Sequence, residues 1–156
     1  MEKTSEVLEK LISLFEDNNI YYILGGHTGL IIQGVELEDD EEIDICTTKQ
    51  DAYKIQELLN GYTIEPVEYK ELEHFRAYWG IFEIKGIKIE IMGDPEIKIE
   101  SGEWIGLPKE NITKTQFNNK EIRVFTLESE YKYYNNSVAK KERNRKIAEK
   151  IKEVLG

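Results

Sequence analysis

Two periodicities of apolar and polar positions run along the chain, and each predicts one kind of element. Over residues 5–18, apolar side chains recur at the three- and four-residue spacings of one helical face, which predicts an amphipathic helix. A β-branched and aromatic run at 20–24 predicts a short buried strand that Gly25 and Gly26 end. Residues 27–33 predict a short helix directly after these glycines.

Farther along, the two-residue alternation of strands dominates, and helical spacing returns at the C-terminal end. Thr48 is expected to cap the helix that follows a strand at 42–47, because a Thr side chain can accept a hydrogen bond from the first helical turn. This order predicts one α+β domain over residues 1–156, with a mixed β-sheet and flanking helices in about 5–126 and C-terminal helices in about 127–155. The other expected elements are strands at 62–70, 112–117 and 121–125, a hairpin within 74–92 that turns near Lys85-Gly86, and helices between Thr48 and Gly61, at 127–136 and at 139–155.

The composition is typical of a folded protein. The 156 residues are 40% hydrophobic and 33% charged, with three Pro, whereas disordered chains contain fewer apolar residues. No apolar run approaches the roughly 18 residues of a membrane span, and the opening MEKTSEVLEK is charged where a signal peptide has an apolar core. A cytoplasmic protein with no membrane partner is therefore expected. Cys46 is the single cysteine and is expected to be a small core residue.

Charge is distributed unevenly along the chain. The net charge of −10 argues against broad affinity for nucleic acids, because lysine and arginine drive such binding by releasing counterions. From Ala139 to Gly156, however, seven Lys or Arg stand against three Glu, a local net charge of +4. This basic stretch has three interpretations: a solvated helix face, a clamp for a triphosphate, or a surface for an acidic partner such as RNA.

Seven of the nine residues in ELEDDEEID, which ends at Asp44, are carboxylates. A solvated loop and a cation site both explain such crowding, and strand alternation separates the two. Ile43 and Ile45 are expected to face the core, so Glu42 and Asp44 would point together to the other face and repel unless a positive group lies between them. The acids of Glu36–Glu41 are expected to form a plain solvated loop.

A third carboxylate lies on the second strand of the hairpin. Isoleucines alternate along GIKIEIM, which places Glu90 on the opposite face with Lys88 and Met92. If this strand neighbours the one that carries Asp44, three carboxylates converge in the oxygen-rich environment that magnesium prefers. Because magnesium keeps positions for waters and phosphates, such a site indicates phosphoryl or nucleotidyl chemistry.

The LGG of residues 24–26, the EIDI of residues 42–45 and the later Glu90 resemble, in order and type, the DNA polymerase beta-type nucleotidyltransferase superfamily, and in particular its small, minimal members. The resemblance covers about residues 20–95. It implies a nucleotidyltransferase-like sheet and a metal-dependent enzyme that moves a nucleoside monophosphate from a nucleoside triphosphate such as ATP to an acceptor. The acceptor stays open among a small molecule, a protein and RNA.

The same resemblance implies roles for individual carboxylates. Glu42, Asp44 and Glu90 would be the catalytic residues and would also be the ligands of Mg²⁺ or Mn²⁺. Glu90 would in addition help to deprotonate the attacking hydroxyl.

Four residues after the first strand would bind the nucleotide. Gly25 and Gly26 have no Cβ, so the backbone there can approach a triphosphate closely. The backbone N–H groups of His27 and Thr28 would face its negative charge.

Two features depart from the superfamily pattern. Glu42 stands where Asp is commoner, and Asp39–Glu41 occupy positions where Arg and Thr often precede the motif. The alternative function is therefore a non-catalytic protein of the same fold that binds a nucleotide or a partner protein, as in toxin–antitoxin-like pairs.

Overall fold

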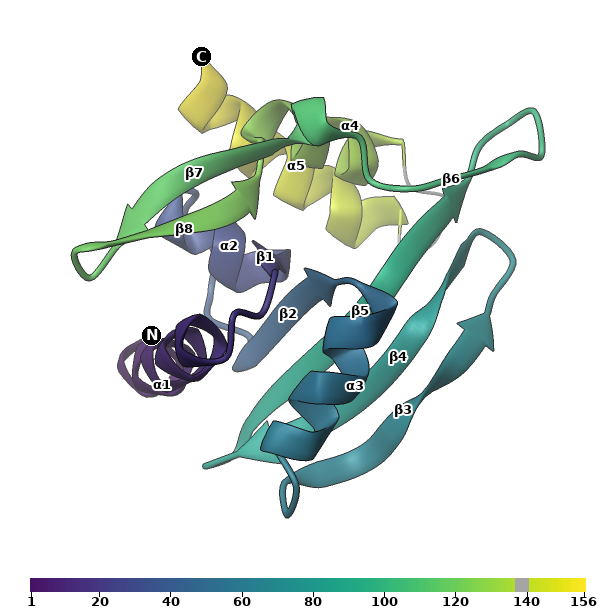
Figure 1. Ribbon diagram of the computed structural model, residues 1–156. Helices are drawn as coiled ribbons and strands as arrows, with labels where there is room; N and C mark the ends of the chain where they lie inside the picture. Colours follow the sequence, from purple (N-terminus) through teal and green to yellow (C-terminus); the bar gives the residue numbers. More distant parts are fainter. Residues whose placement is uncertain (137–140) are drawn as a thin grey trace.

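Figure 1 shows the computed structural model of the protein, which describes residues 1–136 and 141–156. Within these residues, eight strands form one mixed sheet in the order β3-β4-β5-β2-β1-β8-β7, and β6 pairs with β5 beside this path. The strands are β1 (Ile23–Gly25), β2 (Glu42–Thr47), β3 (Thr63–Glu71), β4 (Phe75–Ile84), β5 (Ile87–Lys98), β6 (Trp104–Ile105), β7 (Ile112–Phe117) and β8 (Lys120–Phe125). The helices are α1 (Glu2–Asp17), α2 (Gly26–Ile32), α3 (Lys49–Leu58), α4 (Leu127–Asn135) and α5 (Lys141–Leu155), with a single 3₁₀ turn, η1, at Lys109–Asn111.

Helices α1 and α3 cover one face of the sheet and bury its main apolar core. The apolar side of α1, including Leu8 and Phe15, is fully buried against isoleucines of β2 and β5. Thr48 caps α3 as predicted, since its Oγ1 accepts a hydrogen bond from the backbone N–H of Asp51 at 3.1 Å. These contacts fix which side of β2 and β5 is apolar.

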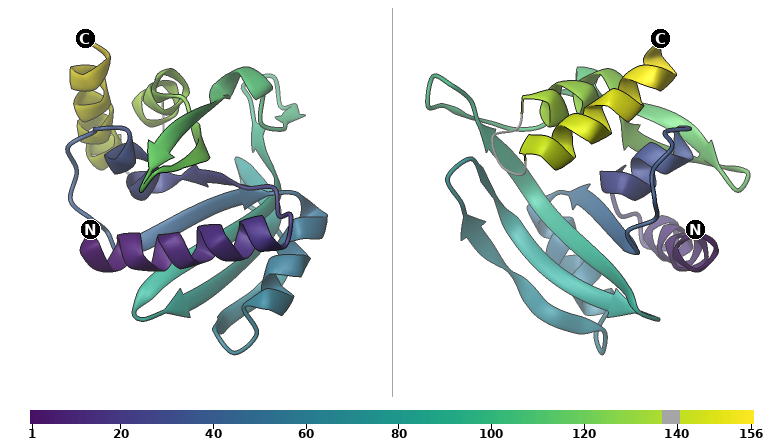
Figure 2. Two further views of the ribbon diagram at one scale, coloured as in Figure 1. Left: turned by 60° about the vertical axis from the view of Figure 1, so that its left-hand side comes forward. Right: turned by 180° about the vertical axis from the view of Figure 1, so that it is seen from behind.

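Helices α2, α4 and α5 gather on the other side of the sheet (Figure 2). Leu30 of α2 and Val35 after it pack against Ile147 and Ile151 of α5 in a second buried apolar cluster. The C-terminal helix therefore returns to lie beside the short helix that follows β1. This packing matters for the site because β2 directs its polar side chains toward the same side.

Strand β2 is central, and its pairings bring the two halves of the sheet together. It pairs antiparallel with β1, where Gly25 lies opposite Asp44, and parallel with β5, where Asp44 lies opposite Glu90. Ile43 and Ile45 are fully buried on the α1 side, as the alternation predicted. Glu42 and Asp44 consequently face the other side together.

The predicted α+β class, with a mixed sheet and C-terminal helices, is confirmed, and β2 has the predicted bounds. Two predicted strands were wrong by more than one residue at a bound. β1 begins only at Ile23, because its pairing with β2 starts there, and β5 runs on past Met92, because β4 and then β6 continue to pair with it. Residues 139 and 140, with which the last helix was expected to begin, lie outside the described residues. No helix in the described part of the chain is long and apolar enough to cross a membrane.

Candidate active site

Three carboxylates from two neighbouring strands converge on the polar side of the sheet. Glu42, Asp44 and Glu90 each offer one carboxylate oxygen, and these oxygens lie within 4.8 Å of one another. The parallel register of β2 and β5 accounts for the convergence, because it sets Asp44 directly beside Glu90 on the same face. The alternation in the sequence predicted this grouping on the condition that the two strands are neighbours. The roles of the three residues in metal binding and catalysis stay predictions.

Asp44 is the most enclosed of the three. Its Oδ1 is buried and has no hydrogen-bond partner among the described residues. Burial raises the pKa of this carboxyl well above its usual range, and the neighbouring charges of Glu90 and then Glu42 raise it further. A carboxylate in this position is stabilised by a cation, which would supply the missing partner and offset the repulsion.

Gly25, the last residue of β1, and Gly26, the first residue of α2, form the wall next to Asp44. Gly26 has a φ of +64°, and a Cβ built on it would collide with Oδ2 of Asp44. Gly25 pairs with Asp44 across the β1–β2 ladder. The backbone can approach the carboxylate this closely only because residue 26 has no side chain.

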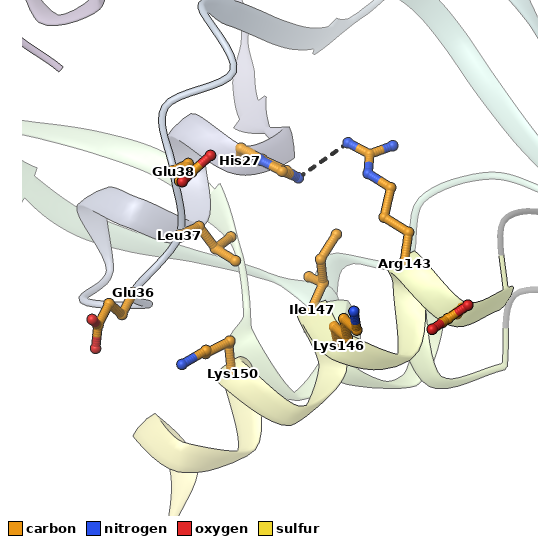
Figure 3. A pocket seen from close by; sticks show the side chains of 9 residues that line it. His27, Glu36, Leu37, Glu38, Arg143, Lys146, Ile147 and Lys150 are labelled. Carbon is orange, nitrogen blue, oxygen red and sulfur yellow. Dashed lines mark hydrogen bonds between the residues drawn. The ribbon is translucent and has the colours of Figure 1, made fainter.

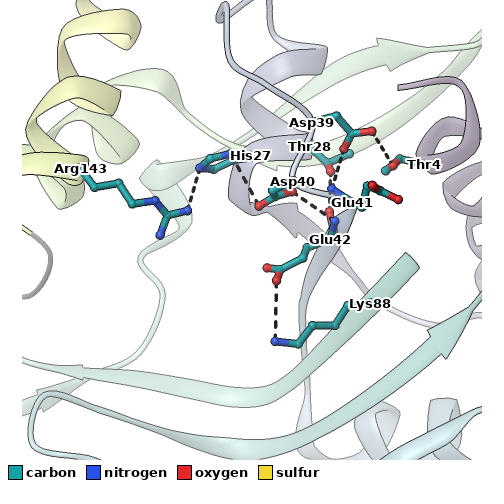
Figure 4. A network of polar contacts seen from close by, with 9 residues as sticks. All are labelled: Thr4, His27, Thr28, Asp39, Asp40, Glu41, Glu42, Lys88 and Arg143. Atoms are coloured by element: carbon teal, nitrogen blue, oxygen red, sulfur yellow. Dashed lines mark hydrogen bonds and ion pairs between the residues drawn. The ribbon is translucent and has the colours of Figure 1, made fainter. Parts of the chain in front are cut away.

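His27 and Thr28 follow these glycines but use their side chains differently. Thr28 is fully buried, and its hydroxyl donates a hydrogen bond of 2.7 Å to the backbone carbonyl of Glu42, which fixes the start of β2. The Nδ1 atom of His27 lies 3.6 Å from Oδ2 of Asp40, and its Nε2 atom lies 3.4 Å from Nη2 of Arg143 (Figure 4). His27 thus joins the acidic segment to α5.

The segment Glu36–Glu41 is only partly the plain solvated loop that was expected. Glu36, Glu38 and Glu41 are exposed, but Asp39 and Asp40 are half-buried and anchored. Asp39 accepts hydrogen bonds from the Thr4 hydroxyl at 2.8 Å and from the backbone N–H of Glu41 at 2.9 Å. Asp40 accepts one of 3.2 Å from the backbone N–H of Glu42 (Figure 4). The correction has a physical reason: short Asp side chains bond the backbone two residues on and so hold the turn into β2.

Lys88 joins the cluster, although the sequence pattern alone predicts no role for it. Its Nζ lies 3.8 Å from Oε1 of Glu42 and 3.7 Å from Oε1 of Glu90. The sequence does contain a signal for this contact: Lys88 stands two residues before Glu90, so strand alternation places both side chains on the same face.

The residues present fit a divalent metal ion. All three donors are carboxylates, the hard oxygen ligands that Mg²⁺ and Mn²⁺ prefer, and one buried oxygen lacks a partner. Two oxygens that hold one Mg²⁺ at roughly 2.1 Å are about 3.0 Å apart when cis and about 4.2 Å apart when trans, so the cluster would contract by at most about 2 Å to bind it. Glu42 in place of the commoner Asp still reaches the group.

The sequence matches the model of the aminoglycoside-2''-adenylyltransferase family over residues 7–150. The chain belongs to this family. The predicted resemblance to a small nucleotidyltransferase is thereby confirmed, and the matched range includes β1, β2, β5 and most of α5. Among curated proteins, no relative matches the sequence significantly.

Solved structures support the same fold for this adenylyltransferase-family protein. The chain is similar to a candidate nucleotidyltransferase from Thermotoga maritima, with 27% sequence identity and a TM-score of 0.76 over 96% of this chain and 91% of that chain. It is also similar to lincosamide antibiotic adenylyltransferase LnuA bound to lincomycin, with 18% identity and a TM-score of 0.67 over 99% and 98% of the two chains. A third structure, ANT(2'')-Ia in complex with adenylyl-2''-tobramycin, has 13% identity and a TM-score of 0.58 over 97% and 94%.

A pocket of about 590 Å³ lies between helix α5 and the acidic segment of this family member, and His27 lines it whereas the three carboxylates do not (Figure 3). Helix α5 supplies one wall with Arg143, Lys146 and Lys150, and the acidic segment supplies Glu36 and Glu38 on the other. Helix α5 packs against α2, which brings Arg143 next to His27, and the clamp interpretation of the basic stretch stays a prediction. Lys140 and the side chain of Lys141 lie outside what the structure describes.

Proposed function

We propose that this protein is a metal-dependent nucleotidyltransferase that moves a nucleoside monophosphate from a nucleoside triphosphate to an acceptor hydroxyl. The observation that carries the proposal is the convergence of Glu42, Asp44 and Glu90, with Oδ1 of Asp44 buried and unpartnered among the described residues and Oδ2 against Gly26. A purely structural cluster of three acids in one place would be strained by mutual repulsion. A cation and a phosphate chain explain both the crowding and the absence of a side chain at residue 26.

The reaction is a displacement at the α-phosphorus of the nucleotide. The acceptor hydroxyl oxygen forms a bond to that phosphorus, and the bond from the phosphorus to the oxygen that bridges to the β-phosphate breaks, so pyrophosphate leaves. Glu90 accepts the hydroxyl proton, since it borders the cluster on the β5 side and its side chain is 18% exposed. A divalent ion held by Glu42, Asp44 and Glu90 would stabilise the negative charge that develops on the leaving group.

Residues on the opposite wall bind the nucleotide in this proposal. Gly25 and Gly26 allow the phosphates to approach the backbone, and the N–H groups of His27 and Thr28 face them. The Thr28 hydroxyl is already bonded to Glu42, so its side chain positions β2 and does not bind phosphate. ATP is the expected donor because the family is one of adenylyltransferases.

The relatives indicate which acceptors to test first. LnuA was solved with lincomycin and ANT(2'')-Ia with an adenylylated tobramycin, so lincosamide and aminoglycoside antibiotics are the leading small-molecule acceptors. Their hydroxyl groups suit the proposed displacement. The protein itself and RNA are the other candidates.

The test is to incubate the protein with each nucleoside triphosphate, Mg²⁺ or Mn²⁺, and each candidate acceptor. Mass spectrometry should detect an acceptor that has gained one nucleoside monophosphate, with an equal amount of pyrophosphate released. Asp44→Asn should lower the rate by at least about 100-fold, because it removes a charged ligand of the metal ion that would stabilise the leaving group. Glu41→Gln is the matched control: it neutralises an exposed carboxylate one residue before the cluster and should leave the rate unchanged.

Two results would count against this function. If wild type and Asp44→Asn transfer the nucleotide at equal rates, the carboxylate cluster is not the active site. Nucleotide binding without any transfer, over the full set of acceptors, would favour the non-catalytic alternative.

A further inference from the structure

Lys88 lies between two members of the carboxylate cluster, because the register of β2 and β5 sets it opposite Glu42 and its own strand carries Glu90 two residues on. Its nearest neighbour across the β4–β5 ladder is Glu83, directly opposite on β4. The ion pairs of Lys88 among the described residues are nevertheless with Glu42, at 3.8 Å, and with Glu90, at 3.7 Å (Figure 4 shows the first). The ammonium group therefore lies between two of the clustered carboxylates, although its side chain is 41% exposed and the exposed Glu83 lies opposite it on β4.

We propose that Lys88 is a positioning residue that holds Glu42 and Glu90 together until a divalent ion enters, and that it then binds a phosphate of the donor nucleotide. The inference rests on the proposed function, since it requires the cluster to bind metal and nucleotide. This role of Lys88 differs from the metal binding proposed for the three carboxylates and from the phosphate approach proposed for Gly25 and Gly26.

The release of Lys88 when a metal ion binds follows from competition, because Lys88 and the ion would both bind the carboxylate oxygens of Glu42 and Glu90. Lys88 is within ion-pair distance of Oε1 of both glutamates, and each glutamate is a proposed metal ligand. An ion held at roughly 2.1 Å from those oxygens would lie within a few ångströms of the ammonium group, where two cations repel strongly. Lys88 must therefore withdraw when the ion binds, and its flexible four-carbon stem allows it to do so without moving β5.

The second half of the proposal follows from where the displaced ammonium can go. The Cα of Lys88 is fixed opposite Glu42 in the β2–β5 ladder, so the head group stays beside the cluster. A nucleotide bound there brings several phosphate charges into reach, and lysine binds phosphate well as a compact point charge. Metal and nucleotide would then help each other to bind, because the phosphate takes up the cation that the metal displaces.

Mn²⁺ binding to the full-length protein tests both halves. Free Mn²⁺ is followed by electron paramagnetic resonance during titration of wild type, Lys88→Met and Lys88→Arg. The affinity for α,β-methylene-ATP is then measured by calorimetry at saturating Mn²⁺. Lys85→Met is the matched control, because Lys85 lies on the same hairpin with 50% exposure but pairs with Glu6 on α1.

The expected results have opposite signs for the two ligands. Lys88→Met should bind Mn²⁺ alone about fivefold more tightly, since a competitor for two carboxylates is gone, and should bind the nucleotide analogue about fivefold more weakly. Lys88→Arg should resemble wild type for the analogue, and Lys85→Met should resemble wild type for both ligands. A simple loss of structure at residue 88 would weaken both and could not tighten Mn²⁺ binding.

Other outcomes overturn the proposal at identifiable points. Equal or weaker Mn²⁺ binding by Lys88→Met, with a functional wild-type site, contradicts the competition. Tighter Mn²⁺ binding with unchanged affinity for the analogue contradicts the phosphate contact. Absence of Mn²⁺ binding by wild type, with or without the analogue, instead overturns the metal site of the proposed function and the role of Lys88 with it. Lys88→Gln provides a second neutral side chain should the methionine variant fail to fold.

Discussion

Glu130, on α4 beside the cluster, gives a quantitative test of the packing over β2. Burial raises the pKa of its carboxyl from 4.5 to about 7. Burial also raises the pKa of the Cys46 thiol on β2, and the charges of Asp44 and then Glu130 raise it further. The folded state therefore holds a proton on Glu130 at pH values where the unfolded chain has lost it. As the pH rises from about 4.5 to about 7, the free energy of unfolding falls, and above that range the loss is complete.

The size of the effect follows from the pKa change. Each pKa unit corresponds to roughly 1.4 kcal/mol, so a rise of this size destabilises the ionised form by at most about 3 kcal/mol at pH 8. This is an upper limit because Glu130 as a whole is half-buried and its head group can move toward water. Glu130→Gln removes the ionisable group, so its free energy of unfolding should exceed that of wild type by about 1–3 kcal/mol at pH 8 and by little at pH 4.5.

The assay is urea denaturation at pH 4.5, 5.5, 6.5, 7.5 and 8.0, followed by circular dichroism. Glu128→Gln is the matched control, because Glu128 is exposed and lies in the same first turn of α4, so it experiences the helix dipole without burial. Its difference from wild type should stay within about 0.5 kcal/mol. The reasoning is refuted if the stability gain of Glu130→Gln is the same at every pH, or if this variant is the less stable one at pH 8.

Two further predictions concern the walls of the site and are tested by thermal or urea unfolding. Gly26→Ala should cost more stability than Gly34→Ala, by about 1 kcal/mol or more, because both glycines have positive φ but only a Cβ at residue 26 meets Asp44; equal costs would contradict the close approach. Thr28→Val should lose about 1–3 kcal/mol, since the buried carbonyl of Glu42 loses its partner, while Thr28→Ser should retain most of the stability; equal losses would show that the methyl group, and not the hydrogen bond, matters.

Much of the site could be predicted because strand alternation is local. The residues on either side of Ile43 share a face whatever the rest of the chain does, and glycine at residue 26 is conspicuous directly after a buried strand. The same alternation placed Lys88 on the face of Glu90. It could not predict that Lys88 turns to Glu42 and Glu90 and away from Glu83, because a flexible side chain chooses among charges that only the folded sheet brings near.

The anchoring of the acidic segment was also beyond sequence patterns. Asp39 accepts a hydrogen bond from Thr4, which lies in the first turn of α1 and is 35 residues away in the chain. Asp40 lies near His27 only because α2 packs against the start of β2. Charge density in the sequence correctly indicated solvent for Glu36, Glu38 and Glu41. It cannot distinguish an exposed acid from one whose partner is distant in the chain.

The sequence by itself determined the α+β class, the bounds of β2, the glycines where β1 meets α2 and the face on which each carboxylate lies, because these depend on side-chain period and backbone freedom within a few residues. Only the tertiary structure decided that β2 and β5 are parallel neighbours in the register that sets Asp44 beside Glu90. It also decided that α5 returns to place Arg143 next to His27. Such pairings join segments far apart in the chain, and they are selected by the burial of the whole apolar face and not by any local pattern.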